Sequence, residues 1–391
     1  MDRYDIRVTF YPYDGLEINL SSAVSGAVSI TNGRTDLTTP LGQTYASLTF
    51  LKAALWDLLA GEGYTPSAFS FGALVKIWVP EAPAYEIPLF WGNITDMSSD
   101  AYEITFSLVA NQIYKATGFF PYNYLGSTEP SDTIASTVIA NTGGGTLINQ
   151  IGTASRTNIE APPQEITNGP AYLAGIVNQA PAQYMYVDTA LDSWVLAQRP
   201  RDSFTHPTIV LAGDDVLLDY SLDRSVEDVY NSVSVVWAGG TYSRENATSI
   251  DRIGLRFVEI TTTIQTEDEA ERFATWFLGA RAPDGFPTIT FRTSGELLGE
   301  FPPWLAEALQ PNNLIDMTAV TAEGFDSYAY IEQVRHTITR SQWRVEIIAT
   351  NADYASLAQT WAEVDPATSW DDVINDPPNS LSWDDLLYTS L

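Results

Sequence analysis

Segments in which apolar and polar residues alternate recur at both ends of this chain, and they constrain its fold more than any other feature. In residues 102–110 the apolar side chains are Tyr102, Ile104, Phe106 and Leu108, and Glu103, Thr105 and Ser107 stand between them. Successive side chains of a strand point to opposite faces, so this pattern predicts a strand with one buried face. Residues 73–80 and 86–96 read as further strands, and residues 49–64 as a helix closed by Gly61 and Gly63. The first region therefore predicts an antiparallel barrel or sandwich with one helix.

Helical patterns replace this alternation between about residues 111 and 213. Residues 130–145 predict a short helix that ends at a glycine run. Residues 167–183 predict a second helix, with Asn168 as its N-cap and Pro170 in its first turn. Residues 184–201 read as a hairpin with its turn near 190–192. This order of elements predicts an inserted α/β unit.

Strand patterns return from Asp214 onward, with one well-specified helix among them. The strand candidates are residues 215–221, 228–240, 253–264, 287–293, 313–322, 330–338 and 343–350. Thr266 and Glu269 form a capping-box pattern at the start of the helix, and acids fill its first turn. Apolar residues then follow helical spacing, at Ala270, Phe273, Ala274, Phe277 and Leu278. The spacing predicts an amphipathic helix over residues 266–279 in a second β region.

The balance of charge excludes several classes of function. The 391 residues contain 49 acids against 19 bases, for a net charge of −30. Such a surface repels nucleic acid, which disfavours sequence-reading DNA binding but suits a wall that DNA slides past. Cysteine is absent and only His206 and His336 are histidines, so thiolate chemistry and His-rich metal centres are not expected. No apolar run approaches the roughly 18 residues of a membrane span, and the start of the sequence lacks a signal-peptide core.

The patterns typical of catalysis are also missing. The glycine run at 143–145 has no lysine after it, which favours a turn over a phosphate loop. Both histidines are expected to be structural. Adjacent acids occur at Asp214/Asp215, Asp371/Asp372 and Asp384/Asp385. Neighbours in a strand point to opposite faces, so adjacency does not indicate a shared site. We expect no catalytic residues, no cofactor and no metal, and hence no enzyme.

The tetrapeptide Ser-Trp-Asp-Asp occurs twice near the end of the chain, at 369–372 and 382–385. Each copy is able to start a helical turn, with Ser as N-cap and the Asp pair at the positive end of the helix. Neither copy is long enough to be stable alone. Two interpretations stay open: the segment folds back on the body of its own chain, or it inserts its tryptophans into a neighbouring protein. The candidate docking residues are Trp370, Trp383, Leu386 and Leu387.

The order of these patterns over about residues 20–350 resembles the minor tail proteins of long-tailed phages of Gram-positive, especially actinobacterial, hosts. These are baseplate hub, or tail-tip, proteins. The similar segments are residues 28–50, 89–110, 184–201, 228–240, 249–291 and 330–350. This sequence has Ile253 where the family usually has an aromatic residue, and it keeps only Arg34 of an early basic motif.

The resemblance implies a mainly β, α+β chain with two antiparallel β-barrels related to the tail-tube fold. We expect a first barrel at 1–112, an inserted α/β domain at 113–213, a second barrel region at 214–352 and an acidic C-terminal segment at 353–391. Three copies would then supply six barrels to a ring that stacks on a sixfold tube. That ring would lie at the distal end of the tail in the virion, after assembly in the host cytoplasm.

The function implied is architectural. The ring would close the tail tube, hold the tape-measure protein, contact the distal tail protein, anchor receptor-binding proteins and open for DNA ejection. Genomic DNA would pass through the lumen without specific binding. Two alternatives remain: a distal tail protein that forms a hexameric ring, and a tail adhesin that binds a receptor or carbohydrate. The aromatic content of the chain would allow the adhesin, and the two β regions flanking an insert favour the hub over the distal tail protein.

Overall fold

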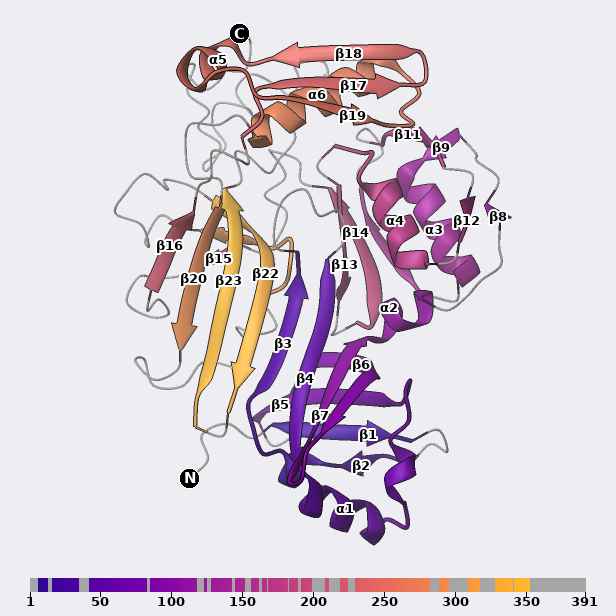
Figure 1. Ribbon diagram of the computed structural model, residues 1–391, viewed down its shortest axis with the longest axis vertical. Coiled ribbons are helices and arrows are strands. Elements are labelled where there is room, and N and C mark those ends of the chain that lie inside the picture. Colours follow the sequence, from indigo (N-terminus) through magenta and orange to yellow (C-terminus); the bar gives the residue numbers. More distant parts are fainter. Residues whose placement is uncertain are drawn as a thin grey trace.

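The computed structural model describes most of the chain up to residue 351 (Figure 1). The described residues are 6–12, 16–34, 42–82, 85–117, 123–124, 128–142, 145–151, 156–161, 164–166, 168–181, 183–188, 191–198, 208–210, 219–223, 229–281, 288–294, 309–316, 328–339 and 341–351. Within these residues strands predominate over helices, which confirms the mainly β, α+β class.

A large mixed sheet dominates the molecule and contains strands from both ends of the sequence. Its path runs β16–β20–β23–β22–β3–β4–β7–β6–β5–β1–β2. The strands of the first region are β1 (Arg7–Tyr11), β2 (Ile18–Asn19), β3 (Val28–Gly33), β4 (Gln43–Leu51), β5 (Leu74–Ala82), β6 (Tyr85–Ser99) and β7 (Glu103–Ala110). Those of the last region are β15 (Thr208–Val210), β16 (Asp219–Asp223), β20 (Thr288–Ser294), β21 (Leu314–Asp316), β22 (Tyr328–Ile338) and β23 (Trp343–Asn351).

Strand β3 joins the two regions because it pairs with β22 on one side and with β4 on the other. Val28 and Ile30 of β3 are buried against Val334 and Ile338 of β22 in one apolar core. Within the described residues the strands form this open path and do not close into a barrel, in contrast to the two barrels expected. The physical reason is the pairing itself: β3 uses both of its edges, one for each region, and so continues the sheet from one region into the other.

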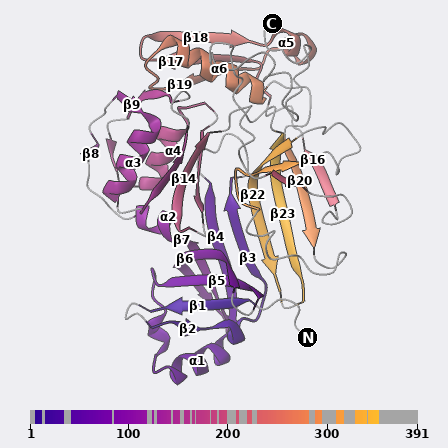
Figure 2. The same cartoon turned by 180° about the vertical axis from the view of Figure 1, so that it is seen from behind.

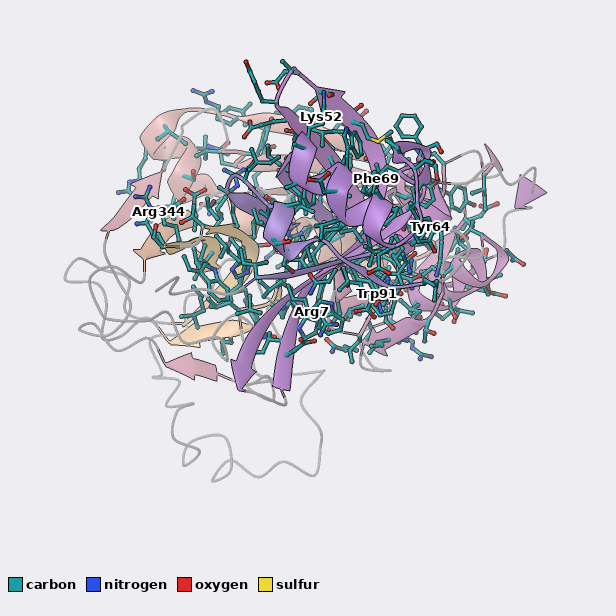
Figure 3. All side chains as sticks on the ribbon, turned by 90° about the horizontal axis from the view of Figure 1, so that it is seen from below. Arg7, Lys52, Tyr64, Phe69, Trp91 and Arg344 are labelled. Atoms are coloured by element: carbon teal, nitrogen blue, oxygen red, sulfur yellow. The ribbon has the colours of Figure 1, made fainter. Side chains whose placement is uncertain are left out.

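The first region has the local structure that its sequence pattern predicts. Ile104, Phe106 and Leu108 of β7 are buried, whereas Tyr102 just before the strand is 80% exposed. Helix α1 (Lys52–Gly61) buries Leu55 and Leu59 at this end of the molecule. Figure 3 views this end from below, with Tyr64 and Phe69 labelled near α1. Short 3-10 turns at Ser21–Ala23 and Pro66–Ala68 complete the region.

The middle of the chain forms a layered α/β unit. Its helices are α2 (Asn111–Ala116), α3 (Ser131–Thr142) and α4 (Gly169–Val177). Its strands are β8 (Asn123–Tyr124), β9 (Thr128–Pro130), β10 (Leu147–Gln150), β11 (Asn158–Glu160), β12 (Gln164–Glu165), β13 (Gln183–Asp188) and β14 (Ser193–Gln198). Figures 1 and 2 show α3 and α4 on one side of the β10–β14–β13 sheet. Asn168 caps α4 by accepting from the amide of Ala171 at 3.0 Å, as expected.

Residues 229–281 form a further unit of three strands and two helices. Its elements are β17 (Ser232–Trp237), β18 (Gly240–Glu245), α5 (Ala247–Ile253), β19 (Phe257–Thr261) and α6 (Glu267–Arg281). Thr266 caps α6 as predicted, because the Glu269 amide donates to Thr266 Oγ1 at 3.3 Å. The Glu269 side chain accepts from the Thr266 hydroxyl at 2.9 Å, and not from its backbone amide as in a capping box. The buried stripe of α6 packs in the same core as the middle unit.

Helix α5 is absent from the sequence expectations, which assign residues 253–264 to a single strand. The chain has the signals of a helix before that strand. Asn246 accepts from the Ser249 amide at 3.0 Å as an N-cap, and Gly254 follows the helix with φ of +80°. Asparagine before a helix and glycine after it are the preferred residues at these positions. Strand β19 therefore begins only at Phe257.

Candidate interaction surfaces

The described residues contain no group of three or more His, Cys, Asp or Glu side chains that could hold a metal ion. In the same part of the chain, no helix combines the length and apolar character that crossing a membrane requires. His336 is buried and accepts a hydrogen bond from Trp343 Nε1 to its Nδ1 at 3.2 Å, which confirms it as a structural residue. His206 lies outside the described residues. Three surfaces and junctions of the described residues are candidate functional sites.

The first candidate is a cationic–aromatic face on strands β1, β5 and β6. The strand register sets Lys76 beside Trp91 on β6, and sets Trp78 beside Arg7 on β1. Lys76 Nζ lies 3.5 Å from the ring centroid of Trp91, 4.9 Å from that of Tyr11 and 5.7 Å from that of Trp78. Rings at these distances attract a cation through their negative faces, at about 0.5–2 kcal/mol for a good pair. Three aromatic rings thus surround one lysine.

The charge of Lys76 is held in this face without a direct carboxylate partner within the described residues. Its pKa is lowered by burial, and the charges of Glu17 and Asp192 oppose that change. Asp192 comes from the turn between β13 and β14 of the middle unit, and burial raises the pKa of its carboxyl group. A cation in aromatic surroundings and an acid from another unit therefore lie near each other at this face.

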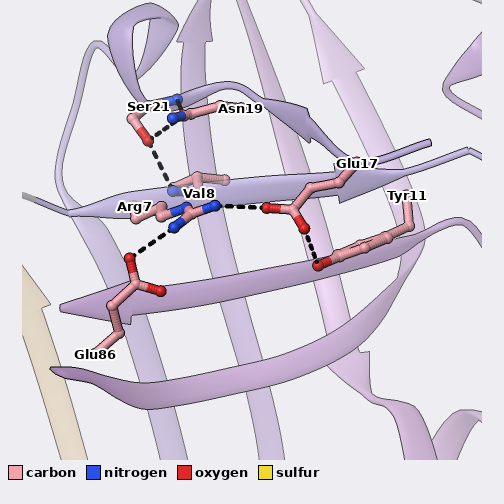
Figure 4. A network of polar contacts seen from close by, with 7 residues as sticks. All are labelled: Arg7, Val8, Tyr11, Glu17, Asn19, Ser21 and Glu86. Atoms are coloured by element: carbon pink, nitrogen blue, oxygen red, sulfur yellow. Dashed lines mark hydrogen bonds and ion pairs between the residues drawn. The ribbon is translucent and has the colours of Figure 1, made fainter. Parts of the chain in front are cut away.

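A polar network borders the same face (Figure 4). The two terminal nitrogens of Arg7 each lie 2.7 Å from a carboxylate, one from Glu17 and one from Glu86. Tyr11 Oη donates to the second oxygen of Glu17 at 2.9 Å. The hydrogen bond to Glu86 is the largest cause of the raised pKa of Arg7, and burial is the largest cause of the raised pKa of Tyr11. The network ties the segment before β2 and strand β6 to β1 and so holds the face in shape.

The second candidate is a junction where the two regions of the large sheet meet the middle unit. Arg34 Nε lies 2.5 Å from Glu332 Oε2, and both side chains are almost fully buried. The pairing of β22 with β23 shifts register between Ile331 and Gln333, which marks a β-bulge at Glu332. A bulge re-aims the side chain of the extra residue. It accounts for a carboxylate that turns toward Arg34 just past the end of β3.

The middle unit contacts this ion pair through Tyr184 on β13. The guanidinium carbon of Arg34 lies 4.3 Å from the centroid of the Tyr184 ring. Tyr184 Oη donates to the carbonyl oxygen of Glu332 at 3.3 Å, and the Gly42 amide donates to the Met185 carbonyl at 2.7 Å. Gly33 adopts φ of +114°, and a Cβ there would stand 2.0 Å from the Glu332 carbonyl oxygen. Only glycine fits at this position.

The third candidate is an exposed apolar stripe where α5 leads into β19. The stripe consists of Ile253, Leu255 and Phe257, with exposed fractions of 38%, 61% and 55%. Gly254 breaks the helix between the first two of these residues. Three large apolar side chains within five positions are more than the single exposed residues that a soluble surface normally carries.

Three tail proteins of known structure have a backbone arrangement similar to that of this chain. The tail protein of Neisseria meningitidis matches 90% of this chain and 100% of its own, with a TM-score of 0.61 and 12% identity. The 43 kDa tail protein of prophage MuSo2 from Shewanella oneidensis matches 90% of this chain and 100% of its own, with a TM-score of 0.56 and 14% identity. The prophage tail protein gp18 of Listeria monocytogenes matches 89% of this chain and 94% of its own, with a TM-score of 0.56 and 9% identity.

This chain has the fold of phage tail proteins. No family model matches its sequence, and no curated protein matches it. The likeness is therefore one of backbone arrangement across nearly the whole chain, at a level of identity where residue roles do not transfer.

The four docking residues inferred from sequence, Trp370, Trp383, Leu386 and Leu387, lie outside the described residues. Their role stays a prediction. None of the three candidate surfaces was among the sequence expectations. Alternation in residues 73–80 does put Lys76 and Trp78 on the face opposite Val75 and Ile77. That pattern could have indicated an exposed face with Lys76 and Trp78 on it. The aromatic partners of Lys76 on the neighbouring strands, Tyr11 and Trp91, follow only from the strand register.

Proposed function

We propose that this chain is a structural protein of a phage tail, and that it forms the tail-tip hub. The observation that carries the proposal is the backbone match to the tail protein of Neisseria meningitidis, which includes all of that chain and 90% of this one. A match of this extent includes the large sheet, the middle unit and residues 229–281 together. A shared arrangement of several units supports a shared architectural role more strongly than one common domain would, since single folds host many functions.

The proposed hub is a ring of three copies, each contributing two tube-like units. The strands β1–β7 would form one unit and the strands β16 and β20–β23 the other, both within the large sheet. Residues 113–213 would be inserted between them, and residues 353–391 would be an acidic extension. The pairing of β3 with β22 supports a rigid relation between the two β regions. Rigid spacing of two similar units is what a threefold ring needs to match a sixfold tube.

The proposed partners are the distal tail protein, the tape-measure protein and receptor-binding proteins, and DNA would pass through the lumen of the ring. A net charge of −30 per copy would oppose adhesion of DNA during ejection. Like-charged copies also repel, so assembly would depend on sheet pairing and apolar burial between subunits. No catalytic step is part of the proposal.

Counting copies in purified virions tests the proposal against its nearest alternative. Quantitative mass spectrometry with labelled peptides from this chain and from the tube protein gives the copy number per tail. Three copies, together with antibody labelling at the distal end of the tail, support the hub. Six copies indicate a distal tail protein instead. Labelling elsewhere in the particle, or no chain in the particle, contradicts both.

A tail adhesin is the second candidate, and the cationic–aromatic face is the observation that favours it. Aromatic rings beside polar side chains are suited to stacking on sugar rings while the polar groups hydrogen-bond to hydroxyls. The full-length chain should then sediment with purified host cell wall. Trp91→Ala should abolish this sedimentation, and Tyr102→Ala, which removes an exposed aromatic side chain elsewhere, should leave it intact. No sedimentation of the unmodified protein contradicts the adhesin.

A further inference from the structure

Within residues 229–281, the exposed large apolar side chains are the three of the stripe: Ile253, Leu255 and Phe257. Val258 and Ile260, which alternate with Phe257 along β19, pack into the core that contains α6. Strand β19 is also an edge strand of its three-stranded sheet, with β17 as its partner. Exposed apolar groups at a sheet edge attract another segment unless something covers them. The stripe therefore has the properties of a docking surface.

The acidic C-terminal segment contains apolar groups with a matching arrangement. In its second repeat, Trp383 is followed by Leu386 and Leu387, which is the i, i+3, i+4 spacing of one helical face. Ser382 precedes Trp383 as an N-cap residue. A single helical turn is unstable alone, because the entropy lost in nucleating it exceeds the stabilisation from its hydrogen bonds. Such a turn therefore needs a surface to fold against. Three apolar side chains on one face correspond to three on the stripe.

The charges beside these groups are complementary. Arg252 precedes Ile253, Arg256 lies between Leu255 and Phe257, and both arginines are exposed residues. Asp384 and Asp385 lie between Trp383 and Leu386 in the repeat. The whole segment of residues 353–391 contains acids and no lysine or arginine. Paired opposite charges around an apolar contact fix its register and select it over other surfaces.

The described chain also leads toward the stripe. Strand β23 ends at Asn351, and both views show that it runs toward the unit of β17, β18 and β19 (Figures 1 and 2). The roughly 30 residues from Asn351 to Ser382 span up to about 100 Å when extended, so the tether does not limit reach. A segment on the same chain also has an effective concentration near the millimolar range, far above that of a second copy in dilute solution.

We propose that residues 382–387 dock on the stripe of their own chain, with Trp383, Leu386 and Leu387 against Ile253, Leu255 and Phe257. Asp384 and Asp385 pair with Arg252 and Arg256 in this arrangement. The contact forms within a single chain, so it does not depend on the proposed place in the virion. It is testable on the isolated full-length protein.

The absence of cysteine allows a direct test by crosslinking. Glu259→Cys places a thiol on the exposed face two residues beyond Phe257, and Thr389→Cys places one just after the repeat. A short bis-maleimide should join these thiols within one chain, which a shift in mobility on a denaturing gel reports. The control pair is Tyr102→Cys with Thr389→Cys, since Tyr102 is exposed at 80% but lies on the loop before β7. We expect at least a fivefold higher yield from the first pair.

Two further variants show whether the stripe and the charges cause that yield. Leu255→Ser with Phe257→Ser should reduce it to the control level, and circular dichroism should show that these exposed positions leave the fold intact. Asp384→Asn with Asp385→Asn changes only the C-terminal segment and should reduce the yield severalfold. Equal yields from the two cysteine pairs overturn the proposal. So does a yield that neither variant changes, or a covalent dimer as the main product, which would assign the segment to a second copy.

Discussion

At the scale of single residues, burial of the Arg34–Glu332 ion pair has a cost in free energy. Both charges are buried, and desolvation of two such groups offsets much of their attraction. The pair therefore contributes little net stability relative to apolar side chains, but removal of one partner takes the buried countercharge from the other. Its position between β3, β22 and Tyr184 suggests that it specifies how three parts of the chain meet.

The first prediction concerns this pair. Glu332→Leu should lower the free energy of unfolding by about 3–5 kcal/mol, because Arg34 loses its buried partner. Arg34→Met combined with Glu332→Leu should recover most of that loss. The matched surface change is Glu86→Leu, which removes a half-exposed partner of Arg7 and should cost at most about 1 kcal/mol. Urea unfolding of the four proteins measures these values. A double variant as unstable as the single one would contradict the account.

His336 gives a second prediction, this time for pH. Burial lowers its pKa from 6.5 to about 4. The unfolded chain takes up a proton near pH 6.5, whereas the folded chain does so only near pH 4. The unfolded state therefore binds more protons in this window, and stability falls as the pH falls through it. The loss is complete near pH 4 and amounts to about 3 kcal/mol.

The control for this prediction is His336→Gln, which keeps an acceptor for Trp343 Nε1 but does not titrate. Carboxylates also titrate in the lower part of the window and affect both proteins equally. The difference in unfolding free energy between the two proteins, followed from pH 7 to pH 4, isolates the histidine. A constant difference across that range would show that His336 is solvated in the folded protein.

At the scale of elements, helix α6 is tied to the middle unit by the same residue that caps it. Glu269 accepts from the hydroxyl of the N-cap residue Thr266 and also from the backbone amide of Asn158 at 2.8 Å. Thr266→Ala should cost about 1 kcal/mol, as expected for a lost N-cap. Glu269→Ala should cost about 2–3 kcal/mol, because it also leaves the amide of Asn158 without its acceptor. Glu267→Ala, an exposed change in the same turn, should cost about 0.5 kcal/mol or less.

Thermal or chemical unfolding of these three variants ranks them directly. An equal effect of Thr266→Ala and Glu269→Ala would mean that the contact with Asn158 adds nothing to stability.

The same scale shows which elements can be predicted from sequence. Strand β7 and helix α6 follow from local periodicity, because one face of each is buried and the other is not. Helix α5 escapes prediction because its only buried residue is Ser249, so it has no apolar stripe, although Asn246 and Gly254 mark its ends. The spacing of Ile253 and Phe257 can be read from the sequence. Whether their side chains are exposed depends on which face of the sheet α6 covers.

At the scale of the whole molecule, the pairing of β3 with β22 could not be predicted. Main-chain hydrogen bonds specify no side chains, so two alternating strands far apart in the sequence have no local signal that they pair. The bulge at Glu332 and the aromatic rings around Lys76 depend on the resulting register. For that reason these two candidate sites could not be predicted from the sequence either. Local pattern predicts elements; long-range register determines which side chains meet.

The molecule that results has two large apolar cores, joined by polar contacts and by a small apolar cluster of Tyr184, Tyr186 and Val195. One core draws on the large sheet and α1, and the other on the middle unit and residues 229–281. Contacts between them include the Arg34–Glu332 pair, Tyr184 and the bond from Gly42 to Met185. Apolar burial is the main favourable term in folding, so polar contacts with one small apolar cluster couple the cores weakly. The two cores should then unfold in separate steps.

Calorimetry on the full chain tests this separation with a matched pair of substitutions. Leu48 on β4 and Leu173 on α4 are both fully buried, one in each core. A buried Leu→Ala change costs about 2–5 kcal/mol. Leu48→Ala should lower the midpoint of one thermal transition and Leu173→Ala that of the other, each by several degrees. Arg34→Met with Glu332→Leu, which removes the polar link, should move the two transitions further apart. A single transition that both leucine variants shift equally would show that the junction makes the two cores one cooperative unit.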